Sequence, residues 1–143
     1  MASEASCRFC QIASLALTSY IVFEDSISLA FLDSRPLFAG HVLLMPREHF
    51  ETLADLPAGT IGAFFRNVQL LAGAVERGMQ AEGTFVAINN RVSQSVPHLH
   101  VHIVPRKKKD GLRGFFWPRQ TYKDEGQMKE AQSAIKDAMA STP

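Results

Sequence analysis

The pattern of apolar and polar residues predicts short strands interrupted by one long helix. Asp25-Ser26 separates the first two apolar runs and predicts a hairpin between them. From about Leu56 to Gln80, apolar residues recur at helical spacing and predict a long amphipathic helix. A weaker helical stripe predicts a last helix over roughly 124–139. Five apolar runs are typical of β-strands: 20–24, 27–33, 41–46, 84–89 and 97–104.

The connections between these runs predict an α+β fold. They are too short for regular crossovers between parallel strands, so an antiparallel sheet is favoured. At 143 residues, with 46% hydrophobic and 20% charged residues, the chain fits one compact domain with a sizeable core.

Charge and hydropathy narrow the class of protein. The formal net charge is +1, which argues against a strongly electrostatic nucleic-acid partner. The apolar runs are too short to span a membrane, and the first six residues lack the apolar core of a signal peptide. We therefore expect a cytoplasmic protein that acts on neither nucleic acid nor membrane.

The run 97–104 carries the most chemistry. His98, His100 and His102 alternate with apolar residues, so a strand would present all three imidazoles on one face. A neutral imidazole is a good nucleophile when a hydrogen bond from Nδ1 to a carbonyl leaves the Nε2 lone pair free. His100 is best placed, because it has a histidine on each side. A polar sheet face without function is the less favoured interpretation.

Cys7 and Cys10 form a Cys-Arg-Phe-Cys motif near the start of the chain. This spacing suits one metal ion or a redox pair, and a metal is favoured because six preceding residues leave no room for a strand and turn. A free thiol with a small core residue is the alternative. The chain contains five histidines as further candidate ligands: His41, His49, His98, His100 and His102.

These motifs resemble the histidine triad (HIT) family. The run 97–104 matches the family's His-apolar-His-apolar-His-apolar-apolar signature. The blocks 23–25, 30–33, 40–44 and 46–49 follow in the family's order. The resemblance implies a single domain over 1–143, with a core at about 7–106 and a C-terminal extension at about 107–143. It also implies an antiparallel five-stranded sheet with one long helix and a C-terminal helix, and a homodimer that continues the sheet.

The resemblance implies a role for each histidine of the signature. His100 would attack the α-phosphate of a nucleotide and form a covalent nucleotidyl-histidine intermediate. His102 would bind the phosphate or help the leaving group depart, and the carbonyl of His98 would orient His100. His41 matches the family's fourth histidine, near the phosphate.

Three residues are candidates for binding the nucleoside part of a purine nucleotide. Asp33 follows an apolar strand, and the resemblance implies that its carboxylate accepts hydrogen bonds from ribose hydroxyls. Phe31 and Ile27 are candidates to line a pocket for the base, although apolar strand residues are more often plain core.

Three more residues are candidates for contacts with phosphate. Gln94 and Ser95 precede the triad, where the family presents polar groups to the α-phosphate and leaving group. Asn90 ends a strand that should neighbour the triad. The loop from Asn90 to Gln94 departs from the family pattern, because Arg91 and Val92 stand where glycine is expected.

The zinc-bearing branch of the family implies the ligand set Cys7, Cys10, His49 and His98. With four protein ligands the zinc would be structural. The reaction strictly requires no catalytic metal, although Mg²⁺ is possible with a polyphosphate substrate.

Two functions remain open. The first is a nucleotidyl hydrolase or transferase that cleaves a dinucleoside polyphosphate, a phosphoramidate or an adenylylated compound. The second is a zinc-stabilised nucleotide-binding or protein-interaction module with incidental turnover. A zinc finger for DNA fits poorly, because the Cys-to-His separation is too long and the charge is near neutral. Lys107 to Lys109 suit a solvated turn, with polyphosphate attraction as the alternative, and Trp117 is a candidate for leaving-group selectivity.

Overall fold

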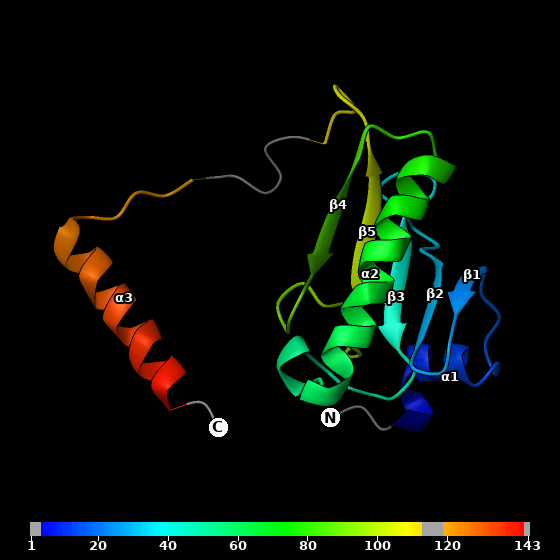
Figure 1. The fold of residues 1–143 in the computed structure, drawn as a ribbon, viewed down its shortest axis with the longest axis horizontal. Coiled ribbons are helices and arrows are strands. Elements are labelled where there is room, and N and C mark those ends of the chain that lie inside the picture. The colour runs from blue at the N-terminus through cyan, green and yellow to red at the C-terminus, as the bar shows by residue number, and fades with distance from the viewer. Residues whose placement is uncertain (1–3, 113–118, 142–143) are drawn as a thin grey trace. The chain divides into compact units, whose positions relative to one another are not determined.

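The computed structural model describes residues 4–112 and 119–141, which belong to two compact units divided after Asp110. The first unit is an antiparallel five-stranded sheet with strand order β1-β2-β3-β5-β4 (Figure 1). The predicted α+β class and five-stranded antiparallel sheet are confirmed. The strands are β1 (Ile21–Glu24), β2 (Ser28–Leu32), β3 (Val42–Pro46), β4 (Gly83–Ile88) and β5 (Val101–Arg106).

Helix α2 (Ala58–Gly78) lies across one face of the sheet (Figure 1). Its buried side chains Phe64, Val68, Leu71 and Val75 recur every three or four residues, as an amphipathic helix requires. Each such side chain contributes about 1.5–3 kcal/mol when fully buried. They form one core cluster with Val101 and other inward residues of the central strands.

The opposite face of the sheet carries a second core cluster and the short helix α1 (Arg8–Ala13). Cys7 caps this helix, because its Sγ accepts a hydrogen bond from the backbone N–H of Cys10 at 3.4 Å. Phe9 and Ile12 of α1 pack against Leu29 and Phe31 of β2. The sequence pattern did not predict α1, since six residues with two buried side chains show no clear period.

The strand boundaries correct two predictions. The strand placed at 97–104 begins at Val101, so only His102 of the triad lies within β5. The strand placed at 27–33 begins at Ser28, because Asp25 accepts hydrogen bonds from the backbone N–H groups of Ile27 and Ser28 and forms a turn there. Alternation within β2 therefore does not reach back to Ile27.

A polar network ties α2 to this turn. The side-chain amide of Asn67, a buried residue of α2, donates to Asp25 Oδ2 at 2.7 Å and to Ser28 Oγ at 2.8 Å. These contacts, with two backbone N–H donors, outweigh desolvation and lower the pKa of Asp25. These hydrogen bonds fix the β1–β2 hairpin against α2.

The second unit contains α3 (Glu125–Ala140), whose first turn is capped by the Asp124 carboxylate on the Gln127 N–H at 2.8 Å. Its apolar residues Met128, Ile135 and Met139 are exposed. Trp117 lies outside the described residues. None of the described helices is long and apolar enough to cross a membrane.

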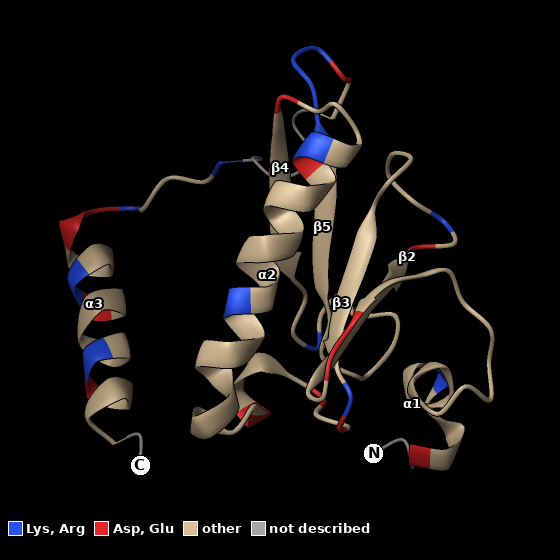
Figure 2. Cartoon of the chain, turned by 45° about the vertical axis from the view of Figure 1, so that its right-hand side comes forward, with Lys and Arg blue, Asp and Glu red and all other residues tan. Residues whose placement is uncertain are grey.

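Charged residues of both signs are spread over the chain, and a basic turn follows β5 (Figure 2). Lys107, Lys108 and Lys109 are exposed there, and the Lys108 backbone N–H donates to Glu82 at 3.0 Å. None of the three lysines lines the cavity described below. This placement fits the solvated turn better than a polyphosphate contact.

Candidate active site and metal centre

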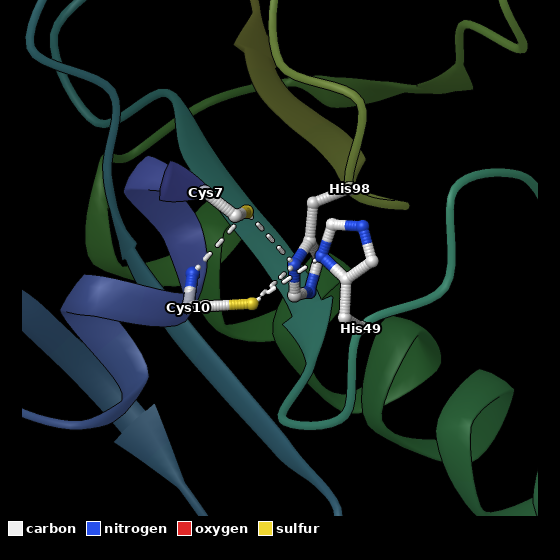
Figure 3. Close-up of side chains that lie close together, drawn as sticks. All are labelled: Cys7, Cys10, His49 and His98. Carbon is white, nitrogen blue, oxygen red and sulfur yellow. Dashed lines mark hydrogen bonds between the residues drawn. The ribbon is translucent and has the colours of Figure 1, made fainter. Parts of the chain in front are cut away.

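Four side chains from three parts of the chain converge at one end of α1 (Figure 3). Cys7 and Cys10 come from the start of α1, His49 from the loop after β3, and His98 from the segment before β5. One donor atom from each lies within 4.8 Å of the others. The structure thus brings together all four residues predicted as metal ligands.

The distances within this cluster fit a tetrahedral zinc ion. The His98 Nδ1 atom lies 3.5 Å from both thiol sulfurs, and His49 Nδ1 lies 3.3 Å from the Cys10 sulfur. Ligand bonds of zinc to sulfur and nitrogen imply a sulfur-to-nitrogen edge of about 3.5 Å in a tetrahedron. The donor set therefore suits structural zinc in both chemistry and spacing.

The tautomer of His98 also suits a metal ligand. Its Nε2 lies 2.8 Å from the Pro46 carbonyl oxygen, an acceptor, so Nε2 carries the proton and Nδ1 offers its lone pair to the cluster. Burial lowers the pKa of His98 to about 4, so the ring is neutral at pH 7. Burial and then the hydrogen bond with Cys7 raise the pKa of the Cys10 thiol to about 12. A bound cation would reverse that shift by stabilising the thiolate.

His100 shows the opposite tautomer. Its Nδ1 lies 2.8 Å from the His98 carbonyl oxygen, so Nδ1 carries the proton and the Nε2 lone pair is available. Burial lowers the pKa of His100, which favours the neutral ring. A neutral imidazole with a free Nε2 is the form that attacks an electrophile.

A second chain of hydrogen bonds sets the tautomer of His102. The backbone N–H of Leu37 donates to His41 Nδ1 at 3.1 Å, so a neutral His41 carries its proton on Nε2. That Nε2 lies 2.9 Å from His102 Nδ1 and donates to it. His102 therefore carries its own proton on Nε2. His100 and His102 together therefore offer two different groups: the Nε2 lone pair of His100 and the Nε2–H donor of His102.

Buried surroundings keep this second pair of rings uncharged. Burial, followed by the charges of His100 and His41, lowers the pKa of His102 to about 4, while Asp33 opposes the shift. Burial also lowers the pKa of His41, again against Asp33. The hydrogen-bond chain is therefore populated in its neutral form at pH 7.

Asp33, His41 and His102 also lie close enough together to suggest a metal, but their hydrogen bonds do not fit one. His41 Nδ1 is already an acceptor for the Leu37 N–H, so its Nε2 holds a proton where a ligand needs a lone pair. Asp33 Oδ2 lies 3.7 Å from that Nε2. The carboxylate lies near the imidazole, where it opposes the lowering of the pKa of His41.

His100 and His102 open into a cavity of about 670 Å³. Its lining combines apolar side chains, among them Phe9, Ile12 and Phe31, with polar ones, among them Asp33, Ser95 and the two histidines. An apolar pocket with a few convergent polar groups is typical of a small-molecule site.

The cavity includes some predicted substrate contacts and leaves others out. Asp33, Phe31 and Ser95 line it, and their contacts with substrate stay predictions. Ile27 does not, because it lies in the turn before β2 and packs against the α2-side core cluster. The prediction that Ile27 lines a pocket with Phe31 is therefore not supported by the structure.

Gln94 and Asn90 use their side chains to hold the loop before the triad. Gln94 Nε2 donates to the Glu51 carbonyl at 2.7 Å, and its Oε1 accepts from the Arg91 N–H at 2.8 Å. Asn90 Oδ1 accepts from the Leu53 N–H at 2.8 Å. Neither residue lines the cavity. Both are placed as loop supports, and their predicted contacts with phosphate find no support in this arrangement.

Phe9 is a site residue that the sequence reasoning missed. Its ring meets His100 edge-on at 5.0 Å between centroids, and it also packs on Phe31 at 5.3 Å. The available signal was its place between the two cysteines. A metal bound by both cysteines would fix the backbone on either side of this aromatic residue.

The chain belongs to the HIT family: the family model of the HIT domain matches residues 15–109. The chain is 32% identical over 108 residues to adenylylsulfatase HINT3 of Arabidopsis thaliana, covering 74% of this chain and 55% of that protein. It is 31% identical to bis(5'-nucleosyl)-tetraphosphatase of Schizosaccharomyces pombe, covering 77% and 62%. It is 32% identical to adenosine 5'-monophosphoramidase HNT1 of Candida albicans, covering 84% and 83%.

Two solved structures extend the comparison. A HIT family member from Bacillus subtilis superposes with a TM-score of 0.82 at 32% identity, covering 95% of this chain and 99% of that one. A zinc-bound histidine triad family protein from Mycobacterium smegmatis gives a TM-score of 0.72 at 31% identity, covering 98% and 100%. These likenesses confirm the HIT fold and support structural zinc in the Cys-His cluster.

Proposed function

We propose that this protein is a nucleotidyl hydrolase or transferase that cleaves a nucleoside 5'-phosphate derivative at the α-phosphorus. The observation that carries the proposal is the pair of imidazoles in the cavity. The Nδ1 of His100 is bound to the His98 carbonyl, and His102 is protonated on Nε2 through His41. This pair combines a nucleophile and a proton donor in one pocket.

In the first step, the Nε2 lone pair of His100 forms a bond to the α-phosphorus. The bond from phosphorus to the leaving group breaks, and its electron pair stays with the leaving group. The Nε2–H of His102 donates a hydrogen bond to the phosphate or to the departing atom of the leaving group and stabilises the charge that develops there, and the leaving group takes its proton from solvent. In the second step, water attacks phosphorus and releases a proton to solvent, the nitrogen–phosphorus bond breaks, and its electron pair returns to Nε2 of His100.

The cavity wall suggests how the nucleotide is held. Asp33 accepts hydrogen bonds from the ribose hydroxyls, and the apolar wall at Phe9 and Phe31 packs on a purine base. The three named relatives differ in what is attached to the nucleoside phosphate. We include dinucleoside polyphosphates, phosphoramidates and adenylylated compounds as candidate substrates, with Mg²⁺ accompanying only a polyphosphate.

The Cys7, Cys10, His49 and His98 cluster holds structural zinc in this proposal. These four residues would hold a zinc ion that would neutralise the two thiolates, and with all four ligands from the protein the metal would be structural. His98 contributes to both sites, because its ring faces the cluster and its carbonyl holds His100. No step of the proposed reaction passes through the metal.

We also propose a homodimer in the cytoplasm. β4 is an edge strand of the sheet and exposes Val86, while the outer face of α2 exposes Ile61 and Leu70. A second copy that covers this edge and helix would continue the sheet. Light scattering coupled to size exclusion tests the dimer, and a monomer at micromolar concentration contradicts it.

The test of the hydrolase proposal is a trapped intermediate. The protein is mixed rapidly with adenosine 5'-phosphoramidate, quenched, and measured by intact-mass spectrometry. We expect an adenylyl adduct that peptide mapping places on His100. Lys129→Ala, an exposed change on α3, should form the same adduct, and His100→Asn should form none.

The competing binding-module hypothesis makes a different prediction for the same samples. If the protein is only a binding module, the native protein and His100→Asn should bind AMP with equal affinity. The two proteins should also hydrolyse the phosphoramidate at the same low rate. Native turnover far above that of His100→Asn rejects the module. An adduct on a residue other than His100 rejects the proposed nucleophile.

A further inference from the structure

Helix α1 connects the metal cluster to the cavity. Cys7 and Cys10 both contribute to the cluster, and Phe9 lies between them in the chain. The Phe9 side chain is buried and lines the cavity. Its ring centroid lies 5.0 Å from that of His100 and 5.9 Å from that of His98, edge-on to the His100 ring. One short helix therefore carries two metal ligands and a wall of the proposed nucleotide pocket.

A second connection runs through His98. Its ring faces the two thiols, and its carbonyl oxygen accepts the Nδ1–H of His100 at 2.8 Å. A movement of the His98 backbone away from the cluster would also move that carbonyl. The nucleophile is thus contacted on two sides by residues that the cluster holds, namely Phe9 at its ring and His98 at Nδ1.

We propose that zinc binding and nucleotide binding are energetically coupled through α1, with Phe9 as the positioning residue that transmits the coupling. This inference rests on the proposed function in one respect, that the cavity binds a purine nucleotide. It adds a regulatory consequence: the affinity of the catalytic cavity for nucleotide depends on whether the Cys-His cluster holds its metal.

The length of α1 gives the physical reason. Isolated helices shorter than about 12 residues are marginal in water, and α1 has six. Zinc holds α1 at Cys7 and Cys10, and a base packed on Phe9 and Ile12 holds the same helix from the cavity side. Two ligands that order the same segment favour each other's binding.

Thermodynamic linkage supplies a test that does not depend on turnover. Zinc affinity is measured by competition with a chromophoric chelator, with and without saturating AMP, and again with GMP. We expect either nucleotide to raise zinc affinity about tenfold, within the usual range of coupling between two sites. By reciprocity, removal of zinc should weaken AMP binding, measured by calorimetry, by the same factor.

A matched pair of variants isolates Phe9. Phe9→Leu keeps an apolar side chain but removes the ring edge on His100, whereas Phe64→Leu makes the same change in the α2-side core. We expect Phe9→Leu to bind one zinc per chain while the coupling falls below about twofold. Phe64→Leu should melt at a lower temperature with its coupling intact, and Phe9→Tyr, which keeps the ring edge, should retain the coupling.

The imidazole nitrogens provide an independent readout. Long-range nitrogen–proton spectra of the zinc-loaded protein should show His100 as one tautomer, protonated on Nδ1. We expect Phe9→Leu and zinc-depleted native protein to show averaged His100 nitrogen shifts. Circular dichroism on the same samples distinguishes this change from global unfolding.

The outcomes separate the coupling from the hydrolase proposal. Zinc affinity that is unchanged by AMP and by GMP overturns the coupling, even if the protein hydrolyses phosphoramidates. The same holds if Phe9→Leu and Phe64→Leu lower the coupling equally. Coupled zinc and AMP binding without any adduct on His100 leaves the coupling standing and removes the hydrolase.

Discussion

The metal cluster and the cavity each contain a histidine of the triad, and these two histidines are opposite tautomers. In the cluster, His98 donates from Nε2 to the Pro46 carbonyl and turns Nδ1 toward the thiols. In the cavity, His100 donates from Nδ1 to the His98 carbonyl and keeps Nε2 free. The two residues are separated by one position in the chain, yet a different backbone carbonyl fixes each ring.

The difference shows that the hydrogen-bond partner of one ring nitrogen decides whether the other nitrogen carries a lone pair or a proton. A carbonyl acceptor on either side leaves a lone pair on the other, for a metal or for an electrophile. His102 receives a histidine donor instead and so becomes a donor itself. His98 and His102 are thereby protonated on Nε2 and His100 on Nδ1, so the three histidines of one motif occupy two tautomers.

The largest effect is expected when the proposed nucleophile is removed. His100→Asn should lower turnover of adenosine 5'-phosphoramidate by about three orders of magnitude or more, because no other group supplies the nitrogen–phosphorus bond. Zinc content and melting temperature should change little, since the metal ligands are untouched. A variant that retains a tenth of native activity contradicts the assignment.

His41 tests the donor state of His102. His41→Ala removes the donor to His102 Nδ1 and should lower kcat about a hundredfold. His41→Gln can accept from the Leu37 N–H and donate to His102, so it should recover much of that loss. Steady-state kinetics compare the two variants. Equal losses in both would mean that His41 acts through its own protonation.

The metal side of the comparison is tested at Cys10, which is only half-buried. Cys10→Ser should reduce bound zinc well below one per chain and lower the free energy of unfolding. The loss is about 4 kcal/mol at free zinc a thousandfold above the dissociation constant. Metal analysis and urea unfolding measure both quantities. Full zinc content in this variant would remove Cys10 from the ligand set.

The pH dependence follows from the lowered pKa values of His102 and His41. His102 titrates at about 4 in the fold, against 6.5 for the ordinary group, because burial, His100 and His41 outweigh Asp33. Between these two values the unfolded chain binds protons that the native state resists. The free energy of unfolding should therefore fall as pH drops from about 6.5 toward 4.

Urea unfolding and kcat/KM over this range check the expectation. Turnover should fall in the same direction, because a protonated His41 cannot accept from the Leu37 N–H. His102→Asn should show a shallower decrease of stability. Stability that rises as pH drops from 6.5 to 4 would contradict the assignment of neutral rings.

The smallest effect is expected from a comparison of two variants, one on each face of the sheet. Ile27→Ala should cost stability, on the order of 1–3 kcal/mol for a partly buried isoleucine, and leave AMP affinity unchanged. Phe31→Ala should weaken AMP binding as well, because Phe31 lines the cavity. Calorimetry compares the two variants. Equal weakening of AMP binding in both would place the base on a different wall.

Local patterns predicted much of this protein. The spacing of Phe64, Val68, Leu71 and Val75 predicted α2 to within a few residues. Alternation around His102 predicted which side chains of β5 face the α2-side core. Resemblance to the zinc-bearing branch predicted the four residues of the Cys-His cluster, which the structure brings together.

Other features depend on contacts that no local pattern encodes. Gln94 and Asn90 bind backbone groups of the distant 51–53 segment, so their side chains are directed away from the cavity. α1 is too short to show a period, and its position follows from capping by Cys7 and packing on β2. Phe9 was missed for that reason.

From the sequence we could predict the resemblance to the HIT family, the five strands to within a few residues, the long helix, and the residue types of both sites. Those properties depend on periodicity and on motifs of adjacent residues. The tautomer of each histidine, by contrast, follows from the tertiary structure. His98 precedes the strand, and its ring meets Cys7 and the Pro46 carbonyl from segments 91 and 52 positions away. A tautomer depends on which group faces each nitrogen, and only folding brings those groups together.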